Sequence, residues 1–374
     1  KRDDLTLLMV EHETEEALFA DRIALIKEGH LIKVGPTREI LSDVELLESL
    51  GVMPLGIPKF FKAVGVPDLP LTPDEGVEAF GTLSMKINQH AYQKMITADE
   101  VALKKHNSPL IECKHLSHTY QGDVKALKDV SMEIFRGEMI AIIGQNGSGK
   151  TTLAKHFNGL LMPTSGEVNV NDKPTADQGI FTLGQSVGYV FQNPDHQIFS
   201  EKVFDEVAFS PRLRNFSEDE VKRCVAEALE AVGLTGQEEE DPFTLTKSGR
   251  QRVAVAAVLA SNPDVLILDE PTTGLDYREQ RSMMNMVRKL NENGSTIIFI
   301  THHMWVVAEY AKRAFVMKDG DILLEGTTRE VFSQGDVLRD AFLRPPHFVE
   351  FSHRLGYTFL TPEEMIACLE GVHD

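Results

Sequence analysis

The run GQNGSGKT at residues 144–151 has the clearest chemistry in the sequence. It fits G-x-x-x-x-G-K-[ST], in which glycines let successive backbone N–H groups turn toward an anion. The apolar run 139–143 before it predicts a buried strand, and residues 152–156 predict the start of a helix. This order of strand, loop and helix predicts a nucleotide phosphate site, aided by the helix N-terminus. The expected phosphate-binding residues are Gly144, Gln145, Asn146, Gly147, Ser148, Gly149, Lys150, Thr151 and Thr152.

Two side chains of this run have predicted individual roles. Lys150 is expected to reach the β- and γ-phosphates, and Thr151 to bind Mg²⁺. A chance glycine-rich turn is the alternative reading. It is disfavoured because the pattern is complete and lies between a strand and a helix.

A second group of reactive side chains follows the apolar run 265–268, which predicts a strand ending in Asp269 and Glu270. Asp269 is expected to hold Mg²⁺ through its water shell, and Glu270 to polarise the attacking water. Alone, such a run would more often be an ordinary strand with a solvated end. The phosphate loop upstream favours the functional interpretation.

The segments after these carboxylates resemble those of ATP-binding cassette (ABC) ATPases. Residues 271–276, PTTGLD, resemble the D-loop of that family, with Asp276 at its end. The apolar run 297–300 leads into Thr301 and His302, which resemble the end of the strand that carries the switch histidine.

Two further motifs stand in family order. Residues 189–194, YVFQNP, resemble the Q-loop, and Tyr120 matches the aromatic residue on which adenine stacks. The resemblance covers residues 110–345 and implies that Gln192 helps Thr151 and Asp269 organise Mg²⁺. It also implies that His302 stabilises the γ-phosphate and that Asp276 signals across an interface between two cassettes. Taken singly, Tyr120 and Gln192 would be a core aromatic and a surface amide.

The signature segment departs from the family pattern. Residues 245–252 read LTKSGRQR, where L-S-G-G-Q or L-S-K-G-E followed by R/K-Q-R is usual. Thr246 keeps a hydroxyl, Ser248 stands in place of a glycine, and Gly249 in place of Gln or Glu. In the family this loop meets the γ-phosphate held by the opposite cassette. A Cβ restricts close approach of backbone to a phosphate. We therefore expect Ser248 to weaken the contact of this loop with the γ-phosphate without abolishing it.

The switch position is followed by a second histidine, His303. His302 is the preferred switch residue because it aligns with His12 of an internal repeat. His303 stands where the family often has Asp, and it is expected to be an exposed residue at a helix start.

Composition sets further limits. The length of 374 residues suggests two or more domains, and the net charge of −19 disfavours a nucleic-acid partner bound through a broad basic face. The three cysteines are scattered, which fits a reduced, cytoplasmic compartment. No apolar run approaches the ~18 residues needed to span a bilayer, so a membrane role would require separate partners.

The N-terminal part repeats the C-terminal half, which indicates duplicated domains. The matching segments are residues 6–12 with 296–302, 27–29 with 318–320, 37–39 with 328–330, and 71–75 with 360–364. We expect this sequence to be part of a longer tandem protein. A degenerate half retained as a scaffold is the less favoured alternative, because His12 and its apolar run match the pattern well.

The predicted fold class is α/β: a P-loop ABC cassette with a parallel core sheet, an antiparallel β subdomain and a helical subdomain. Before it lies the C-terminal part of another cassette. The expected divisions are residues 1–80 for that part, 81–107 for a polar linker, 108–345 for the complete cassette and 346–374 for a C-terminal extension. A strand is expected in the apolar run before His12, and a β-hairpin around Gly29. Helices are expected at residues 13–20, 217–232 and 362–370.

The segment from Gln192 to Phe209 most resembles the energy-coupling-factor and cobalt importers. That resemblance implies ATP and Mg²⁺ as cofactors, a transmembrane coupling subunit, a substrate-binding membrane subunit and a second cassette as partners. It places the chain peripherally on the cytoplasmic face of the cell membrane, driving uptake of a vitamin, metal ion or other small solute. The alternatives are a soluble tandem ATPase acting on ribosomes or DNA, and a catalytically weak nucleotide-binding subunit.

Overall fold

The computed structural model describes residues 6–11, 13–83, 85–103 and 108–370. It forms two compact units: one holds residues 94–275 and 279–345, the other residues 1–93, 276–278 and 346–374. The boundary falls inside a helix, α5 (Gln89–Leu103), so much of the predicted linker is helical. The predicted C-terminal extension belongs to the same unit as the N-terminal segment. Each unit is described by itself.

The larger unit is built on a sheet with the order β12-β11-β5-β10-β9-β8. Strands β11, β5, β10, β9 and β8 run parallel, and β12 joins antiparallel to β11. The central strands are uninterrupted apolar runs buried along their length, as parallel strands covered on both faces should be. The bounds are β5 (Met139–Ile143), β8 (Val187–Val190), β9 (Val265–Asp269), β10 (Thr296–Ile300), β11 (Arg313–Lys318) and β12 (Asp321–Thr327).

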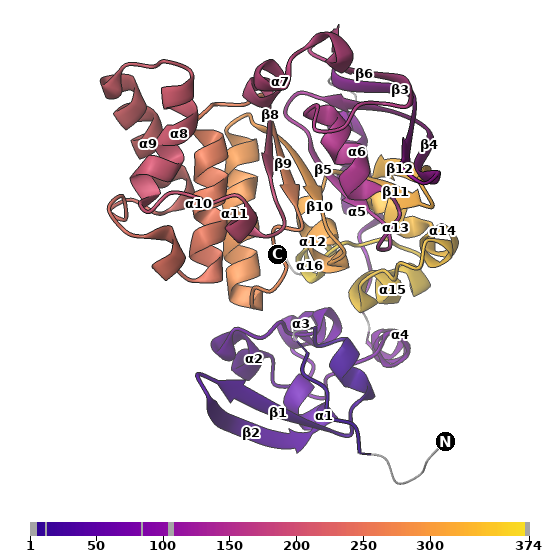
Figure 1. The fold of residues 1–374 in the computed structure, drawn as a ribbon. Helices are drawn as coiled ribbons and strands as arrows, with labels where there is room; N and C mark the ends of the chain where they lie inside the picture. The colour runs from indigo at the N-terminus through magenta and orange to yellow at the C-terminus, as the bar shows by residue number, and fades with distance from the viewer. Residues whose placement is uncertain (1–5, 12, 84, 104–107, 371–374) are drawn as a thin grey trace. The chain divides into compact units, whose positions relative to one another are not determined.

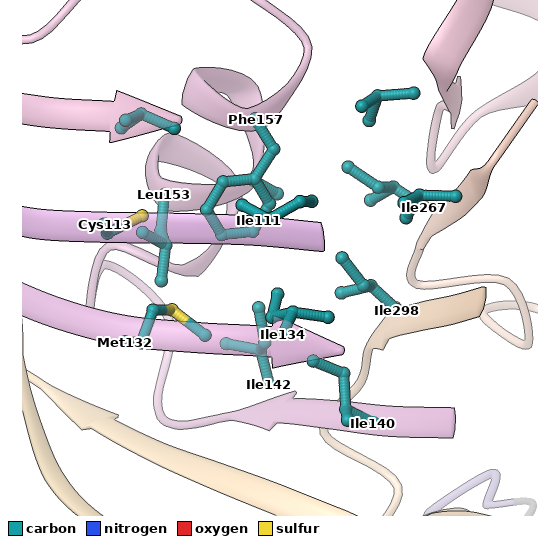
Figure 2. Close-up of a cluster of buried hydrophobic side chains, with 14 of the residues drawn as sticks. Ile111, Cys113, Met132, Ile134, Ile140, Ile142, Leu153, Phe157, Ile267 and Ile298 are labelled. Carbon is teal, nitrogen blue, oxygen red and sulfur yellow. The ribbon is translucent and has the colours of Figure 1, made fainter. Parts of the chain in front are cut away.

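A separate antiparallel sheet has the order β4-β3-β6-β7. Its strands are β3 (Pro109–Tyr120), β4 (Val124–Phe135), β6 (Ser165–Val170) and β7 (Lys173–Pro174). Figure 2 shows side chains of this sheet, among them Ile111 and Ile134, meeting Ile140 and Ile142 of the core sheet and Phe157 of helix α6 (Lys150–Phe157) in one buried cluster. The expected antiparallel subdomain is therefore confirmed.

The helical subdomain consists of α8 (Val203–Leu213), α9 (Glu218–Val232) and α10 (Lys247–Leu259), which pack side by side (Figure 1). Helix α9 begins with a capping box between Ser217 and Glu220, as its sequence predicts. The other helices of this unit include α7 (Ile180–Ser186), α12 (Met304–Tyr310), α13 (Thr328–Ser333) and α14 (Gly335–Asp340). Short 3-10 turns are η2 (Thr175–Asp177), η3 (Pro194–His196) and η4 (Pro242–Thr244), and α11 (Tyr277–Glu292) follows the D-loop.

The smaller unit contains the predicted hairpin, formed by β1 (Arg22–Lys27) and β2 (His30–Pro36). The expected helix at residues 13–20 is reduced to the 3-10 turn η1 (Glu16–Phe19). The apolar run of residues 6–10 was expected to be a strand, and that prediction is wrong: these residues form no strand, and Leu8 is 90% exposed. Its counterpart β10 is held between β5 and β9, and the described part of this unit offers no such neighbours. His12 lies outside the described residues.

Aromatic side chains hold the smaller unit together. Phe60 of α3 (Gly56–Ala63) and Phe351 of α15 (His347–Arg354) lie 6.0 Å apart between ring centroids. Phe80 of α4 (Pro73–Thr82) lies 6.4 Å from Phe351. Residues 346–370 therefore pack against the N-terminal helices. The helices are α1 (Thr37–Leu41), α2 (Val44–Leu50), α3 (Gly56–Ala63), α4 (Pro73–Thr82), α15 (His347–Arg354) and α16 (Pro362–Ala367), the last shorter than the expected 362–370.

Candidate nucleotide-binding site

The phosphate loop joins β5 to α6, as predicted. Gly144 has φ +152°, and a Cβ built on it would lie 2.2 Å from the backbone O of Met317. Gly149 has φ +103°, and its Cβ would lie 2.7 Å from the backbone O of Ala126. Both positions therefore need glycine, because backbone of neighbouring segments approaches the loop. Between them, Ser148 is buried.

Lys150 is buried within this loop. Its Nζ donates to the backbone O of Gly144 at 2.8 Å and of Gln145 at 2.9 Å. Burial lowers the pKa of Lys150, and the nearby carboxylates of Glu270 and Asp269 act in the opposite direction. The ammonium group is thus held inside the loop, where a phosphate group bound by the loop N–H groups would lie.

Asp269 ends strand β9 and meets the start of α6. Thr151 Oγ1 donates to Asp269 Oδ2 at 3.1 Å, and the Tyr189 hydroxyl donates to the same oxygen at 2.7 Å. Burial raises the pKa of Asp269, while the hydrogen bonds from Tyr189 and Thr151 oppose that rise. A hydroxyl beside a carboxylate is an oxygen donor set that suits Mg²⁺, which takes one or two protein ligands together with substrate phosphates.

Glu270 follows in a strained conformation with φ +50°. Its N–H donates to the backbone O of Ile300 at 2.9 Å, which joins the ends of β9 and β10. Its side chain is buried, and His302 Nδ1 donates to Glu270 Oε2 at 2.8 Å. Thr273 Oγ1 donates to the same oxygen at 3.3 Å. The predicted base and the predicted switch histidine are thus brought together.

His303 does not match its prediction as an exposed residue. It precedes α12 as expected, but it is only 9% exposed and hydrogen-bonds through Nδ1 to Thr272 Oγ1 at 2.9 Å. Burial lowers the pKa of His303 to about 4. The reason is tertiary: Thr272, which is distant in sequence, lies against the His303 ring, so this side chain meets protein and not solvent.

Three other residues were predicted to belong to the site. Tyr120 ends β3, is partly exposed, and its hydroxyl lies 3.1 Å from Thr152 Oγ1 at the start of α6. Gln192 is exposed just beyond β8, the neighbour of β9 (Figure 1). Asp276 is exposed and immediately precedes α11.

The signature segment forms the N-terminus of α10. Thr246 is its N-cap, and its Oγ1 accepts from the N–H of Gly249 at 3.1 Å. Ser248 is 8% exposed, so its side chain is largely covered. Lys247 lies against the D-loop: a Cβ on Gly274 would come within 2.4 Å of Lys247 Nζ. The signature and D-loop segments are therefore neighbours within this unit.

Two functional contacts were missed at the sequence level. Tyr189 belongs to the motif YVFQNP but was given no role, although it holds Asp269. Arg250 Nε donates to Asp195 Oδ1 at 2.7 Å, which ties the segment after Gln192 to the signature helix. The position of Tyr189 at the end of an apolar run, beside the strand that carries Asp269, was the only available signal.

Two known protein families match the segments that form this site. The sequence profile described as "ABC transporter" matches residues 127–273. A second profile, described as "AAA domain, putative AbiEii toxin, Type IV TA system", matches residues 248–308. Together the two matches include the phosphate loop, the signature, both carboxylates and the two histidines.

Curated proteins with similar sequences are also described as transporter ATP-binding proteins. A "putative ABC transporter ATP-binding protein" of Caldanaerobacter subterraneus is 52% identical over 98% of the chain, which spans 65% of that relative's length. A relative of the same description from Methanosarcina acetivorans is 36% identical, and the chain spans 57% of it. The "energy-coupling factor transporter ATP-binding protein EcfA" of Methanothermobacter thermautotrophicus is 39% identical, and the match covers 71% of the chain and 86% of that protein.

Solved structures share the fold. The structure of cbiO1 from Clostridium perfringens, described as part of the ABC transporter complex cbiONQ, matches with a TM-score of 0.58 and 38% identity over 65% of the chain and 98% of cbiO1. A dimeric ATP-binding cassette bound to ADP and Pi matches with a TM-score of 0.54 and 30% identity over 59% of the chain and 99% of that cassette. The chain therefore belongs to the ATP-binding proteins of ABC transporters.

Proposed function

We propose that this chain hydrolyses ATP to drive an importer of the energy-coupling-factor or cobalt type. The observation that carries the hydrolytic part is the convergence at the end of β9. Thr151 contacts Asp269 at 3.1 Å, and His302 contacts Glu270 at 2.8 Å, beside the buried Lys150. These are the groups needed to hold phosphates, bind a metal ion and orient a water molecule.

Each residue has a role in that reaction. Backbone N–H groups of the loop from Gly147 to Thr151 hold the phosphates, and Lys150 neutralises charge that develops during transfer. Glu270 orients the attacking water and accepts its proton. His302 fixes the Glu270 carboxylate through Nδ1–H, and in its doubly protonated form it also donates from Nε2 to the γ-phosphate. Tyr120 supplies the surface on which adenine stacks.

Thr151 and Asp269 would hold Mg²⁺, with Gln192 as a third contact. Bound there, the ion would neutralise charge on the nucleotide phosphates. Tyr189 keeps the Asp269 carboxylate oriented toward Thr151. Among the described residues, no cluster of three or more His, Cys, Asp or Glu side chains could hold a metal ion.

An exposed aromatic pair supports a protein partner. Phe199 and Phe209 are 62% and 48% exposed and lie edge to face, 4.9 Å apart between centroids. The segment that presents Phe199 is held by buried Glu206, whose Oε2 accepts from the N–H groups of Phe199 and Ser200 at 3.0 and 2.9 Å. We assign this preorganised apolar pair to a transmembrane coupling subunit.

The same segment connects to the catalytic face. Asp195, which follows Gln192, is bound by Arg250 of the signature helix, and Gln197 Nε2 donates to the backbone O of Ala254 at 3.1 Å. A partner that moves this segment would therefore move both Gln192 and α10. This linkage supports coupling between a membrane subunit and ATP hydrolysis.

The names of the relatives support the subfamily. One relative is an energy-coupling factor protein, and cbiO1 is described as part of an ABC transporter complex. Among the described residues, no helix is long and apolar enough to cross a membrane. We assign the chain to the cytoplasmic membrane face, paired with a second cassette and with separate membrane subunits that select a vitamin, metal ion or other small solute.

The test uses matched aromatic substitutions. Phe199→Asp should abolish co-sedimentation of the protein with membranes of the cells that produce it, while MgATP hydrolysis persists. Phe181→Asp is the control, since Phe181 is comparably exposed at 50% but lies on α7. Equal membrane association of both variants would contradict the partner assignment. Absence of ATP hydrolysis in the wild type with its membrane partners would contradict the ATPase assignment.

A further inference from the structure

Four contacts form a ring that joins the Tyr120 side chain to α6, the helix after the phosphate loop, through two buried histidines. The Tyr120 hydroxyl lies 3.1 Å from Thr152 Oγ1. The backbone O of Thr152 accepts from His156 Nδ1 at 2.7 Å. His156 Nε2 lies 3.1 Å from His118 Nδ1, and the His118 ring meets Tyr120 edge to face at 4.6 Å.

Local periodicity explains why these four residues meet. His118 and Tyr120 are two apart on β3, so both side chains project from one face of the strand. Thr152 and His156 are four apart on α6, so both lie on one side of the helix. One strand face therefore lies against one helix side, and each supplies two members of the set.

The hydrogen-bond donors follow from the acceptors. A carbonyl only accepts, so His156 Nδ1 carries the hydrogen and its Nε2, in the neutral ring, is an acceptor. His118 Nδ1 then donates, shared between His156 Nε2 and the backbone O of Met162, each at 3.1 Å. His118 Nε2 is buried and has no hydrogen-bond partner among the described residues. The two rings are thereby fixed in one orientation each.

Burial makes this arrangement rigid. His156 is fully buried and His118 is 8% exposed, whereas Tyr120 is 40% exposed. Burial also lowers the pKa of His156, which favours the neutral ring that the hydrogen bonds require. An exposed aromatic ring at a strand end would otherwise sample several rotamers. Its two fixed contacts are His118 on one edge and Thr152 at the hydroxyl.

We propose that His118 and His156 are positioning residues that hold Tyr120 in register with the phosphate loop, and so set the affinity of the site for the adenine part of ATP. The inference rests on the proposed nucleotide site. Phosphate contacts come from the loop itself, so the histidine pair acts on the base and not on the phosphates.

The experiment compares binding of MgATP with binding of magnesium tripolyphosphate, which lacks adenine. His118→Ala should weaken ATP binding about threefold to tenfold, the range of one edge-to-face ring contact. Tripolyphosphate binding should be unchanged, and kcat at saturating ATP should stay near that of the wild type while KM rises. His118→Phe, which keeps a ring against Tyr120, should recover part of the loss.

A double-mutant cycle gives the sharpest result. If His118 acts through Tyr120, then His118→Ala combined with Tyr120→Ala should bind ATP no more weakly than Tyr120→Ala alone. Additive losses, unchanged ATP binding in His118→Ala, or equal losses of ATP and tripolyphosphate would each overturn the inference. Failure of the wild type to bind ATP would instead overturn the proposed function.

Discussion

The Tyr189 hydroxyl donates to Asp269 Oδ2 across 2.7 Å, from the end of β8 to the end of β9. Asp269 is buried, and burial raises the pKa of its carboxyl group. A hydrogen bond to the charged form favours that form, so Tyr189 helps keep Asp269 ionised and oriented toward Thr151. In the proposed function, the tyrosine would act on the Mg²⁺ site through the aspartate.

Tyr189→Phe should therefore raise the Mg²⁺ concentration needed for half-maximal ATP hydrolysis. Removing a hydrogen bond to a charged group costs about 1.5–3 kcal/mol, which corresponds to roughly tenfold or more in metal affinity. The pKa of Asp269 would rise further, so the defect should grow as pH falls. Mg²⁺ titrations at two pH values check this. A Mg²⁺ requirement equal to that of the wild type would contradict the role of Tyr189.

His303 predicts a pH-dependent stability. Its pKa is lowered from 6.5 to about 4 in the folded protein. The unfolded chain therefore binds a proton that the folded chain excludes, and stability falls as pH drops from 6.5 toward 4. At about pH 5, His303 therefore lowers the free energy of unfolding by about 2 kcal/mol.

Urea unfolding of the wild type and His303→Asn at neutral pH and near pH 5 isolates that contribution. Asparagine keeps a polar partner for Thr272 but does not titrate, so the variant should lose less stability on acidification. All other acid-sensitive groups are shared by the two proteins. Equal acid losses in both would show that His303 is not the group responsible.

Ser248 offers a test of the unusual signature. We expect Ser248→Gly to raise ATP turnover about threefold to tenfold, which is ~0.7–1.4 kcal/mol in the barrier. The reason is removal of the Cβ where a phosphate must approach the helix N-terminus. Ser248→Ala keeps the Cβ and should not gain turnover. A gain in both variants would implicate the hydroxyl, and a gain in neither would mean that the signature is not locally defective.

Lys150→Met should abolish detectable ATP binding, because the variant keeps the side-chain length but loses the charge that faces the phosphates. It also leaves the carbonyls of Gly144 and Gln145 without their donor. Removing a buried donor costs about 1–3 kcal/mol, so the nucleotide-free protein should also melt at a lower temperature. Lys173→Met, on exposed β7, is the control for both measurements. Retained ATP binding would contradict the assignment of the loop.

Local patterns predicted the larger unit well. The apolar runs of β5, β9 and β10 and the capping box of α9 are local signals, and each element forms there. The order of the motifs in the sequence predicted Glu270 as the base and His302 as the switch histidine. Their contact could be expected because the carboxyl ends of parallel strands lie at one edge of the sheet.

What failed depended on neighbours distant in sequence. Residues 6–10 have the composition of a strand, but a strand needs partners on its edges, and none forms there in the described part of the chain. His303 was predicted to be exposed because the residue that covers it, Thr272, is distant in sequence. The pairing of His118 with His156 requires knowing which strand face meets α6. A periodic pattern of neighbouring residues predicts none of these contacts.

The most direct test of the account measures phosphate release from MgATP against protein concentration, for the wild type and Glu270→Gln. The account predicts release that rises faster than linearly in the wild type, because two cassettes must pair. In Glu270→Gln, ATP binding should persist while release is lost. Release in Glu270→Gln equal to that of the wild type would contradict the assignment of Glu270 and His302 as the hydrolytic pair.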